Sequence, residues 1–320
     1  MSQDSIFEKT TVVGAGLMGG QIGLVMAAGS RETVLMSRRT ESLDRALEDV
    51  RRYAETLHEH GQMNRPQEVT GRIRTTTDLG EALEGASFVV ESIPEDLEQK
   101  QLLFRRMDEL APLDAVLASN TSGLPITQIA ARAMNRHRIV GSHFVQPAHI
   151  VPVVEVVRGQ DTSEDVFERT CAIWERLNKI PLRVNRDIPG FLVNRLQHAL
   201  IREAVRLLAS GVASAAEIDM AVQLGLAPRF TTAGPLKQRD INGLDTHARV
   251  ARHLWPTLDG WQEALAYVQQ MVTSGETGLE AGKGYYDWSD TDPVGVRREK
   301  DRQLLRRTRE VMADWAAERT

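Results

Sequence analysis

Short runs of β-branched and apolar residues alternate with longer amphipathic stretches through the first half of the chain. In the stretch 41–60, apolar residues recur at steps of three and four, and 97–110 is also long enough for a helix that crosses between two strands. Strands that alternate with helices at this spacing predict an α/β fold with a parallel, doubly wound sheet. We expect its strands at residues 10–13, 33–36, 87–90, 115–118, 139–143 and 153–157.

The second half of the chain changes character after residue 190, where strand patterns cease. Its helical patterns fall at residues 191–210, 213–224, 255–271 and 294–319. Proline and glycine interrupt the pattern at the change, in the segment 185–190. We therefore expect two domains: an α/β domain over 1–187 and an all-helical domain over 188–320.

Composition and charge exclude several classes of partner. The 320 residues are 42% hydrophobic and 26% charged, which is typical of a soluble chain with more than one core. The 39 basic and 44 acidic side chains give a net charge of −5, so no nucleic-acid or membrane partner is expected. The single cysteine, Cys171, can form no internal disulfide and cannot hold a metal alone. With no secretion signal and no long apolar window, we expect a cytoplasmic protein without a metal site that acts on a small molecule.

A glycine motif stands directly after the first expected strand and opens an apolar helix. In such a loop the first glycine permits a tight turn, the second lets the backbone approach a pyrophosphate, and the third lets helix pack on strand. Free amides and the helix dipole then face the negative charge. We expect a Rossmann-type domain whose dinucleotide contacts Gly14, Gly16, Leu17, Met18 and Gly19. The alternative is a glycine-rich turn that serves packing alone.

The end of the second expected strand bears on the choice of dinucleotide. An NAD site usually offers a carboxylate to the adenosine ribose there, whereas this chain has Ser37-Arg38-Arg39. A hydroxyl beside arginines can hydrogen-bond and neutralise a 2′-phosphate, which favours NADP over NAD, with Ser37 and Arg38 as the contacts. The alternative is that the two arginines are solvated charges at a helix start, paired with Glu41 and Asp44.

Polar residues that an ordinary core would avoid gather in four segments, 118–123, 141–147, 152–157 and 189–195. The first two follow apolar strands, and ligands of open α/β sheets bind beyond the carboxyl ends of strands. Glu155 sits inside an apolar strand, where an unpaired carboxylate is costly, so it must have a partner.

With these segments and with 89–95, 234–236 and 282–286, the chain resembles the 3-hydroxyacyl-CoA dehydrogenase family from Thr11 to Trp288. The resemblance implies an N-terminal Rossmann domain, a helical C-terminal domain and a homodimer. It also implies an enzyme that transfers a hydride between NAD(P) and a CH–OH carbon. The family's contacts around the nicotinamide ribose fall on Ser92, Glu95 and Lys100.

Matched to the family's motifs, the catalytic base falls on His143 and its partner on Glu155. His143 would take the hydroxyl proton during oxidation and return it on reduction, while Glu155 keeps the imidazole in the right tautomer. Ser122 and Asn194 would hydrogen-bond the developing oxyanion or hold His143 in place. The alternatives are a structural histidine, a buried hydrogen-bonding glutamate, and Ser122 as a cap of a turn or helix.

Two departures from the family leave the substrate open. Gln146 stands where family members mostly have asparagine, and the lysine-rich helical excursion that receives the nucleotide part of CoA is missing. One hypothesis is a 3-hydroxyacyl-CoA substrate and hence fatty acid metabolism. A second is a small free hydroxy acid, as in the branches of L-gulonate 3-dehydrogenase (lambda-crystallin), carnitine dehydrogenase and pyridine-carboxylate dehydrogenase. A third is a non-catalytic, crystallin-like dinucleotide-binding protein. Candidates to receive a free carboxylate are Arg195, Arg229 and Lys237.

Overall fold

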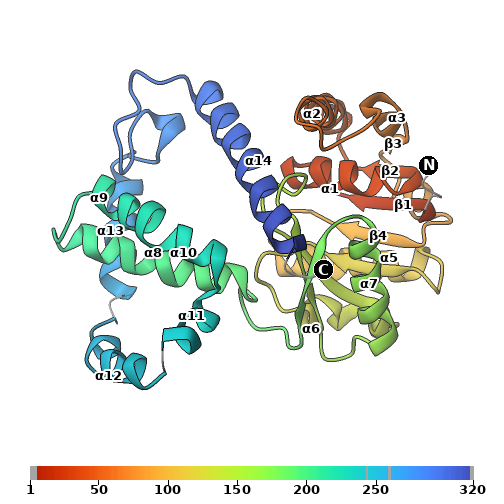
Figure 1. The fold of residues 1–320 in the computed structure, drawn as a ribbon. Helices are drawn as coiled ribbons and strands as arrows, with labels where there is room; N and C mark the ends of the chain where they lie inside the picture. Colours follow the sequence, from red (N-terminus) through yellow and green to blue (C-terminus); the bar gives the residue numbers. More distant parts are fainter. Residues whose placement is uncertain (1–5, 243, 259–260, 318–320) are drawn as a thin grey trace. The chain divides into compact units, whose positions relative to one another are not determined.

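The structure, a computed structural model, describes residues 6–242, 244–258 and 261–317 (Figure 1). In these residues eight strands form one sheet, in the order β3-β2-β1-β4-β5-β6-β7-β8. They are β1 (Phe7–Val13), β2 (Ser30–Met36), β3 (Ile73–Thr76), β4 (Phe88–Glu91), β5 (Val116–Ser119), β6 (Ile139–Phe144), β7 (Val153–Val157) and β8 (Ile180–Val184). The predicted α/β class and doubly wound sheet are confirmed.

One pair of strands departs from the expected parallel arrangement. β6 and β7 run antiparallel, whereas the other neighbours in this sheet are parallel. The connection over residues 145–152 is too short for a parallel crossover, which needs a dozen residues or more. The sequence patterns also missed β3 and β8, the two edge strands. β3 is short and polar, and β8 contains Pro181 and Arg183, which an edge strand tolerates.

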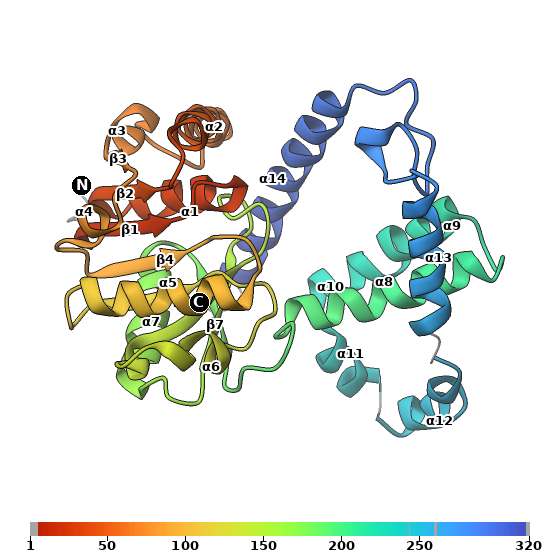
Figure 2. The same cartoon turned by 180° about the vertical axis from the view of Figure 1, so that it is seen from behind.

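Helices cover both faces of the sheet because side chains alternate along each strand. Val12 and Leu35 pack with α1 (Leu17–Ala27), α2 (Thr40–Glu59) and α7 (Glu164–Arg176) in one core. Their neighbours Val13 and Val34 point into a second core. That core is closed by α4 (Leu79–Leu83), α5 (Leu97–Leu110) and α6 (Ile126–Ile129), seen from behind in Figure 2. Shorter segments are α3 (Pro66–Gly71), η1 (Ala130–Arg132) and η2 (Arg136–Arg138).

The described C-terminal part of the chain is helical, with isolated bridges at residues 278–287 as its only strand-like pairing. Its elements are α8 (Val193–Ala209), α9 (Ala215–Met220), η3 (Ala221–Leu226), α10 (Ala227–Thr232), α11 (Pro235–Asn242), α12 (Leu244–Leu254), η4 (Trp255–Thr257), α13 (Trp261–Thr273), η5 (Leu279–Ala281) and α14 (Pro293–Ala317). The helix expected over 255–271 is instead η4 followed by α13, and that expected over 213–224 is α9 with a π-helical stretch at η3. Residues 318 and 319 of the last predicted helix lie outside the described residues.

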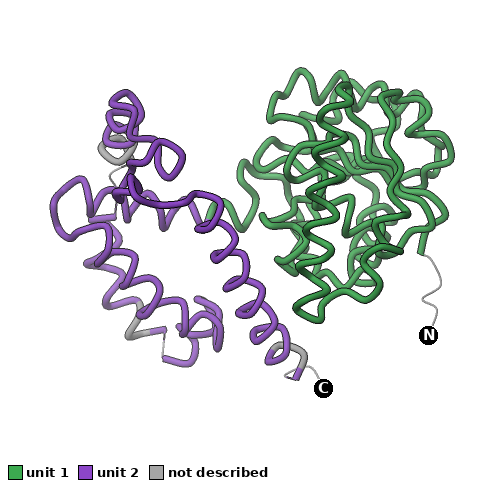
Figure 3. Tube along the Cα trace, turned by 90° about the horizontal axis from the view of Figure 1, so that it is seen from above, with its two compact units in different colours: residues 1–195 green, residues 196–320 purple. Residues whose placement is uncertain are grey.

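The chain divides into two compact units, residues 1–195 and 196–320 (Figure 3). The first contains the sheet, helices α1 to α7 and the start of α8, and the second contains the rest of α8 and the helices that follow it. The domain boundary after residue 187 stays a prediction. Among the described residues, no helix has the length and apolar character that a membrane span requires.

Candidate active site

His143 and Glu155 face each other across the antiparallel pair of strands. They are register partners on β6 and β7, and the imidazole Nδ1 lies 2.6 Å from Glu155 Oε2. Both side chains are buried, and Glu155 is 0% exposed. The structure therefore supplies the partner that a carboxylate inside an apolar strand requires.

The second oxygen of Glu155 anchors the start of α8. Oε1 accepts hydrogen bonds from the backbone amides of Leu192 and Val193 at 2.8 and 2.9 Å. Burial alone would raise the pKa of Glu155, but the hydrogen bonds from His143 and from these two amides hold it below its ordinary value. An ionised carboxylate accepts the Nδ1 proton of His143, so the other ring nitrogen, Nε2, is left as the base.

Phe191 packs beside the imidazole and was not singled out by sequence reasoning. Its ring centroid lies 5.9 Å from that of His143. Its φ of 46° is in the left-handed region that a bulky residue rarely adopts. Because Gly190 before it also has positive φ, the backbone turns sharply just before the amides that bind Glu155. A positive φ has no sequence signal when the residue is phenylalanine.

Ser122 and Asn194 are brought together by a hydrogen bond. Asn194 Nδ2 donates to the carbonyl oxygen of Ser122 at 2.8 Å. Ser122 is exposed, and within the described part of the chain no protein group hydrogen-bonds its Oγ. Ser122 is not a helix cap, because α6 begins after Pro125 without a side-chain cap. Its hydroxyl can therefore meet a substrate.

Asn120 links the turn that carries Ser122 to the strand that carries His143. Its Oδ1 accepts the amide of Phe144 at 2.9 Å, and its Nδ2 donates to Ser92 Oγ at 3.3 Å. Phe144 directly follows His143 in β6. The polar ends of β4, β5 and β6 therefore meet at one edge of the sheet.

The glycine loop has the geometry that a dinucleotide requires. Gly14 has a φ of +117°, and a β-carbon there would lie 2.3 Å from the carbonyl oxygen of Ser92. A β-carbon on Gly19 would lie 1.8 Å from the Gly14 carbonyl oxygen. At Gly16, by contrast, a β-carbon would meet no protein atom within 4 Å. Packing explains Gly14 and Gly19, whereas Gly16 borders open space that a pyrophosphate can occupy.

The start of α1 leaves its amides available for that anion. Its N-cap is Gly16, which offers no side-chain cap. Leu17 is 51% exposed, whereas the side chain of Met18 packs against the core, so Met18 can offer only backbone. The residues present therefore fit a dinucleotide phosphate at the helix N-terminus.

The positions predicted to contact the adenosine ribose differ in their exposure. Ser37 is half-buried at the end of β2, and Arg38 and Arg39 are exposed at the start of α2. In the part of the chain that the structure describes, neither arginine pairs with Glu41 or Asp44. The two arginines are thus solvated charges at a helix start without these ion pairs, and the choice of dinucleotide stays a prediction.

Lys100 is almost wholly enclosed by protein. It is 1% exposed, and its ammonium contacts Glu91 Oε1 at 2.5 Å, the Ile93 carbonyl at 3.3 Å and Glu95 Oε2 at 3.4 Å. Glu95 also accepts the amides of Ser122 and Gly123 at 3.0 and 3.1 Å. Sequence reasoning gave no role to Glu91, although an acidic residue at the end of an apolar strand is a signal that could have found it.

The loop between β6 and β7 is anchored by two buried polar side chains. Lys179 donates to the carbonyls of Ala148 and Val151 at 2.6 and 2.9 Å, and Gln21 of α1 accepts the amide of Ala148 at 2.7 Å. Burial lowers the pKa of Lys179 to about 8. The loop that joins the strands of His143 and Glu155 is thus tied to the helix that follows the glycine loop.

His149 of the same loop is a buried residue. Its ring stacks on Tyr53 with centroids 4.4 Å apart, and its Nδ1 has no hydrogen-bond partner. Burial, followed by the charges of Lys179 and Arg52, lowers its pKa to about 4. It is therefore a neutral packing residue at neutral pH.

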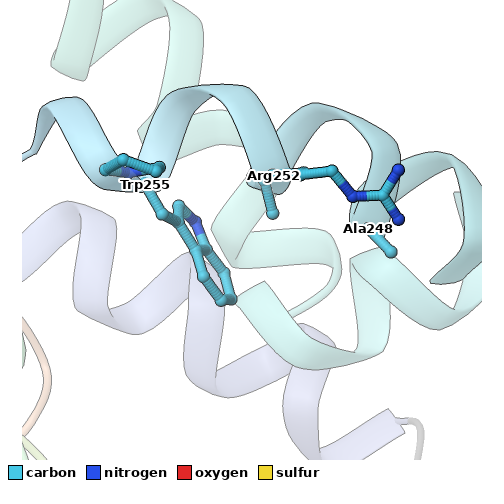
Figure 4. A pocket seen from close by; sticks show the side chains of 5 residues that line it. Ala248, Arg252 and Trp255 are labelled. Carbon is cyan, nitrogen blue, oxygen red and sulfur yellow. The ribbon is translucent and has the colours of Figure 1, made fainter.

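The described residues of the second unit include a pocket. It has a volume of about 430 Å³ and is lined by Ala248, Ala251, Arg252, Trp255 and Pro256 of α12 and η4 (Figure 4). Arg229 and Lys237, the proposed carboxylate receivers, are exposed on α10 and α11. Arg195 donates to the Pro189 carbonyl at 3.2 Å. The described residues contain no cluster of histidine, cysteine and acidic side chains able to hold a metal.

Comparison with known proteins places these features in a family. Residues 9–188 match the model of the 3-hydroxyacyl-CoA dehydrogenase NAD binding domain, and residues 190–288 match that of the C-terminal domain. The chain is 30% identical over 300 residues to 5-formyl-3-hydroxy-2-methylpyridine 4-carboxylate 5-dehydrogenase of Mesorhizobium japonicum, covering 94% of this chain and 97% of that protein. It is 34% identical over 282 residues to a probable 3-hydroxybutyryl-CoA dehydrogenase of Deinococcus radiodurans, covering 88% and 100%.

A solved structure is similar to this chain over nearly its whole length. The crystal structure of a 5-formyl-3-hydroxy-2-methylpyridine 4-carboxylic acid 5-dehydrogenase, described as an NAD⁺-dependent dismutase, has a TM-score of 0.89 at 28% identity. The match covers 96% of this chain and 99% of that one. The two family models match consecutive segments of the chain, and the two relatives match over most of its length. The chain therefore belongs to the 3-hydroxyacyl-CoA dehydrogenase family of oxidoreductases, with an NAD-binding N-terminal domain.

Proposed function

We propose that the protein is an NAD(P)-dependent dehydrogenase that interconverts a 3-hydroxyacyl group, carried as a CoA thioester, and its 3-keto form. The observation that supports this most directly is the 2.6 Å contact between His143 Nδ1 and the buried Glu155 carboxylate. A histidine held in one tautomer by an ionised partner is suited to move a single proton. The fold presents this pair on the sheet that also carries the dinucleotide loop.

In the oxidative direction His143 Nε2 takes the hydroxyl proton of the substrate. A nicotinamide held by the glycine loop would supply the acceptor for the hydride of the carbon that bears this hydroxyl, so the alcohol would lose two electrons and two hydrogens in all. Glu155 stabilises the imidazolium that forms, without itself becoming protonated. Ser122 Oγ donates to the substrate oxygen as negative charge develops there, and Asn194 holds the Ser122 turn through its hydrogen bond to the carbonyl.

A small free hydroxy acid is the second candidate substrate. It is favoured by the TM-score of 0.89 to a pyridine-carboxylate dehydrogenase, against 0.72 to a 3-hydroxybutyryl-CoA dehydrogenase of Escherichia coli. Turnover should be measured by the absorbance of NADH and of NADPH with 3-hydroxybutyryl-CoA, free 3-hydroxybutyrate, L-gulonate and pyridine carboxylates. Saturation with the thioester at micromolar concentration supports the first candidate, and turnover of free acids alone supports the second. Turnover of none, with NADH still bound, supports the non-catalytic hypothesis.

The assignment of the base is tested by His143→Ala. Removing a general base should lower kcat by about 10²- to 10⁴-fold while NADH binding, followed by fluorescence, stays at the wild-type level. His58 is an exposed histidine on α2, and His58→Ala is the matched control that should keep full activity. Wild-type turnover in the His143 variant would contradict the proposal.

We further propose that Ser37 and Arg38 favour NADP over NAD. The support is the half-buried hydroxyl at the end of β2 beside an exposed guanidinium that forms no ion pair within the described residues. Arg38→Ala should then weaken NADPH binding far more than NADH binding. Equal weakening of both would reverse the preference, and Arg45→Ala, further along α2, controls for a general loss of positive charge.

We also propose that the protein is a homodimer that associates through its second unit. Many large apolar side chains of that unit are exposed, among them Leu224, Leu236, Ile241 and Trp255. A soluble monomer rarely leaves so many uncovered. Sedimentation equilibrium should give twice the monomer mass, and Leu236→Glu should shift the equilibrium toward monomer.

A further inference from the structure

Glu91 is a buried carboxylate with no assigned role in the mechanism above. It ends β4, is 0% exposed, and has both oxygens occupied. Oε1 accepts from Lys100 at 2.5 Å and from the Ile93 amide at 2.7 Å, and Oε2 accepts from Ser119 Oγ at 2.6 Å. A carboxylate buried this completely holds its hydrogen-bond donors in place, because the loss of a donor would leave buried negative charge without a partner.

Lys100 also contacts a second carboxylate, that of Glu95. The same ammonium that binds Glu91 lies 3.4 Å from Glu95 Oε2. Two carboxylates therefore share one ammonium, and the trio carries one net negative charge. Burial alone would raise the pKa of Glu95, but Thr121, Lys100 and the Gly123 amide lower it overall. Glu95 stays ionised and can accept several hydrogen bonds at once.

Those hydrogen bonds all come from the turn that carries Ser122. Glu95 Oε1 accepts from Thr121 Oγ1 at 2.5 Å and from the amides of Ser122 and Gly123 at 3.0 and 3.1 Å. Ser119, at the start of the turn, binds Glu91 directly and also accepts the Thr121 amide at 3.2 Å. The turn is held at both ends by the same charged trio.

We propose that Glu91 is a positioning residue that, through Ser119, Lys100 and Glu95, fixes the turn over residues 119–123 for catalysis. The inference rests on the proposed function in that Ser122 is taken to meet the substrate oxygen. The side chain of Asn194 then depends on Glu91 as well, because within the described chain it hydrogen-bonds the Ser122 carbonyl. A purely stabilising ion pair has no such directional link to the site.

The chain offers a matched control on α5, the helix that carries Lys100. Asp108, near the other end of α5, forms a buried ion pair with Arg138, with side chains 3% and 2% exposed. Asp108 accepts the amides of Met134 and Asn135, and within the described chain none of its hydrogen bonds reaches a predicted site residue. Glu91→Gln and Asp108→Asn each replace a buried carboxylate by its amide and should lower the thermal midpoint alike.

The experiment compares amide hydrogen exchange and kinetics in these two variants. Glu91→Gln should speed exchange in the peptide covering 119–124 at least tenfold and lower kcat at least tenfold. Asp108→Asn should do neither. Exchange at the wild-type rate in Glu91→Gln, or equal acceleration in Asp108→Asn, overturns the proposal, as does accelerated exchange with unchanged kcat.

Two further variants keep the test decisive if Glu91→Gln fails to fold. Ser119→Ala removes one donor to Glu91 without unpairing a charge, and should give a smaller change in the same exchange and kcat. Glu91→Gln combined with Lys100→Met removes the pair together, and should match the single variant if the two act as one unit. If the wild-type protein turns over none of the tested substrates, the proposed function fails, while the exchange result still decides whether Glu91 fixes the turn.

Discussion

Glu155 holds His143 with one carboxylate oxygen and the first turn of α8 with the other. The helix that presents Asn194 is therefore oriented by the same group that orients the base. Negative charge at a helix N-terminus is favourable, so this arrangement stabilises both elements at once. Within the first unit the site is thus built from the ends of β4, β5 and β6, the middle of β7 and the start of α8.

Glu155→Gln should abolish most of the activity. A glutamine can present its amide to Nδ1 and drive the imidazole into the tautomer whose Nε2 already carries a proton, which leaves no base. We expect kcat to fall by about 10²- to 10⁴-fold, with the Kd for NADH unchanged. Glu168→Gln, an exposed carboxylate on α7 paired with Arg183, should keep wild-type kcat. Full activity in the Glu155 variant would refute the role of the dyad.

The same carboxylate should give the protein part of its acid sensitivity. Because the folded-state pKa of Glu155 lies below its ordinary value of 4.5, its contribution is fully present above pH 4.5 and is lost as pH falls through the lowered value. Urea unfolding between pH 7 and pH 3 should show a loss of unfolding free energy in wild type that is smaller in Glu155→Gln. Parallel losses in the two proteins would contradict this.

The sequence predicted the strands that lead to the site better than the contacts that shape it. Apolar runs between turn residues revealed β4, β5, β6 and β7, because buried central strands carry a strong pattern. Resemblance placed Ser122 and Asn194, but the hydrogen bond between them joins residues 72 positions apart. Such a contact leaves no trace in local periodicity. The positive φ of Phe191 was missed because the residue type gives no signal of it, whereas the acidic residue at the end of an apolar strand could have pointed to Glu91.

Substitution by alanine should have different effects at Gly16 and Gly19, the second and third glycines of the dinucleotide motif. Gly16→Ala adds a methyl group where no protein atom lies within 4 Å, so folding should be preserved and the Kd for NADH should rise tenfold or more. Gly19→Ala forces its β-carbon against the Gly14 carbonyl oxygen, so it should lower the thermal midpoint as well. Thermal unfolding and NADH fluorescence separate the two. Unchanged NADH affinity in Gly16→Ala would show that the ligand does not approach there.

His149 gives the last prediction, because burial next to Lys179 opposes its protonation. Its pKa in the folded state is about 4 against 6.5 ordinarily, so between these pH values the unfolded chain binds a proton that the folded chain does not. Stability should therefore fall as pH drops from 6.5 to 4, by on the order of 3 kcal/mol from this group alone. His149→Phe keeps a ring to stack on Tyr53 but cannot titrate, so it should lose less stability over that range.

The measurement is urea unfolding of both proteins at intervals from pH 8 to pH 4. Between pH 7 and 8 the imidazole is neutral in both the folded and the unfolded chain. The difference in unfolding free energy between the two proteins in that range therefore measures the effect of the substitution on packing alone. Below pH 6.5 the difference should shift steadily in favour of the phenylalanine variant. A difference that stays constant down to pH 4 would mean that His149 is protonated in the folded protein as readily as in the unfolded chain, and that the loop joining β6 to β7 opens enough to hydrate it.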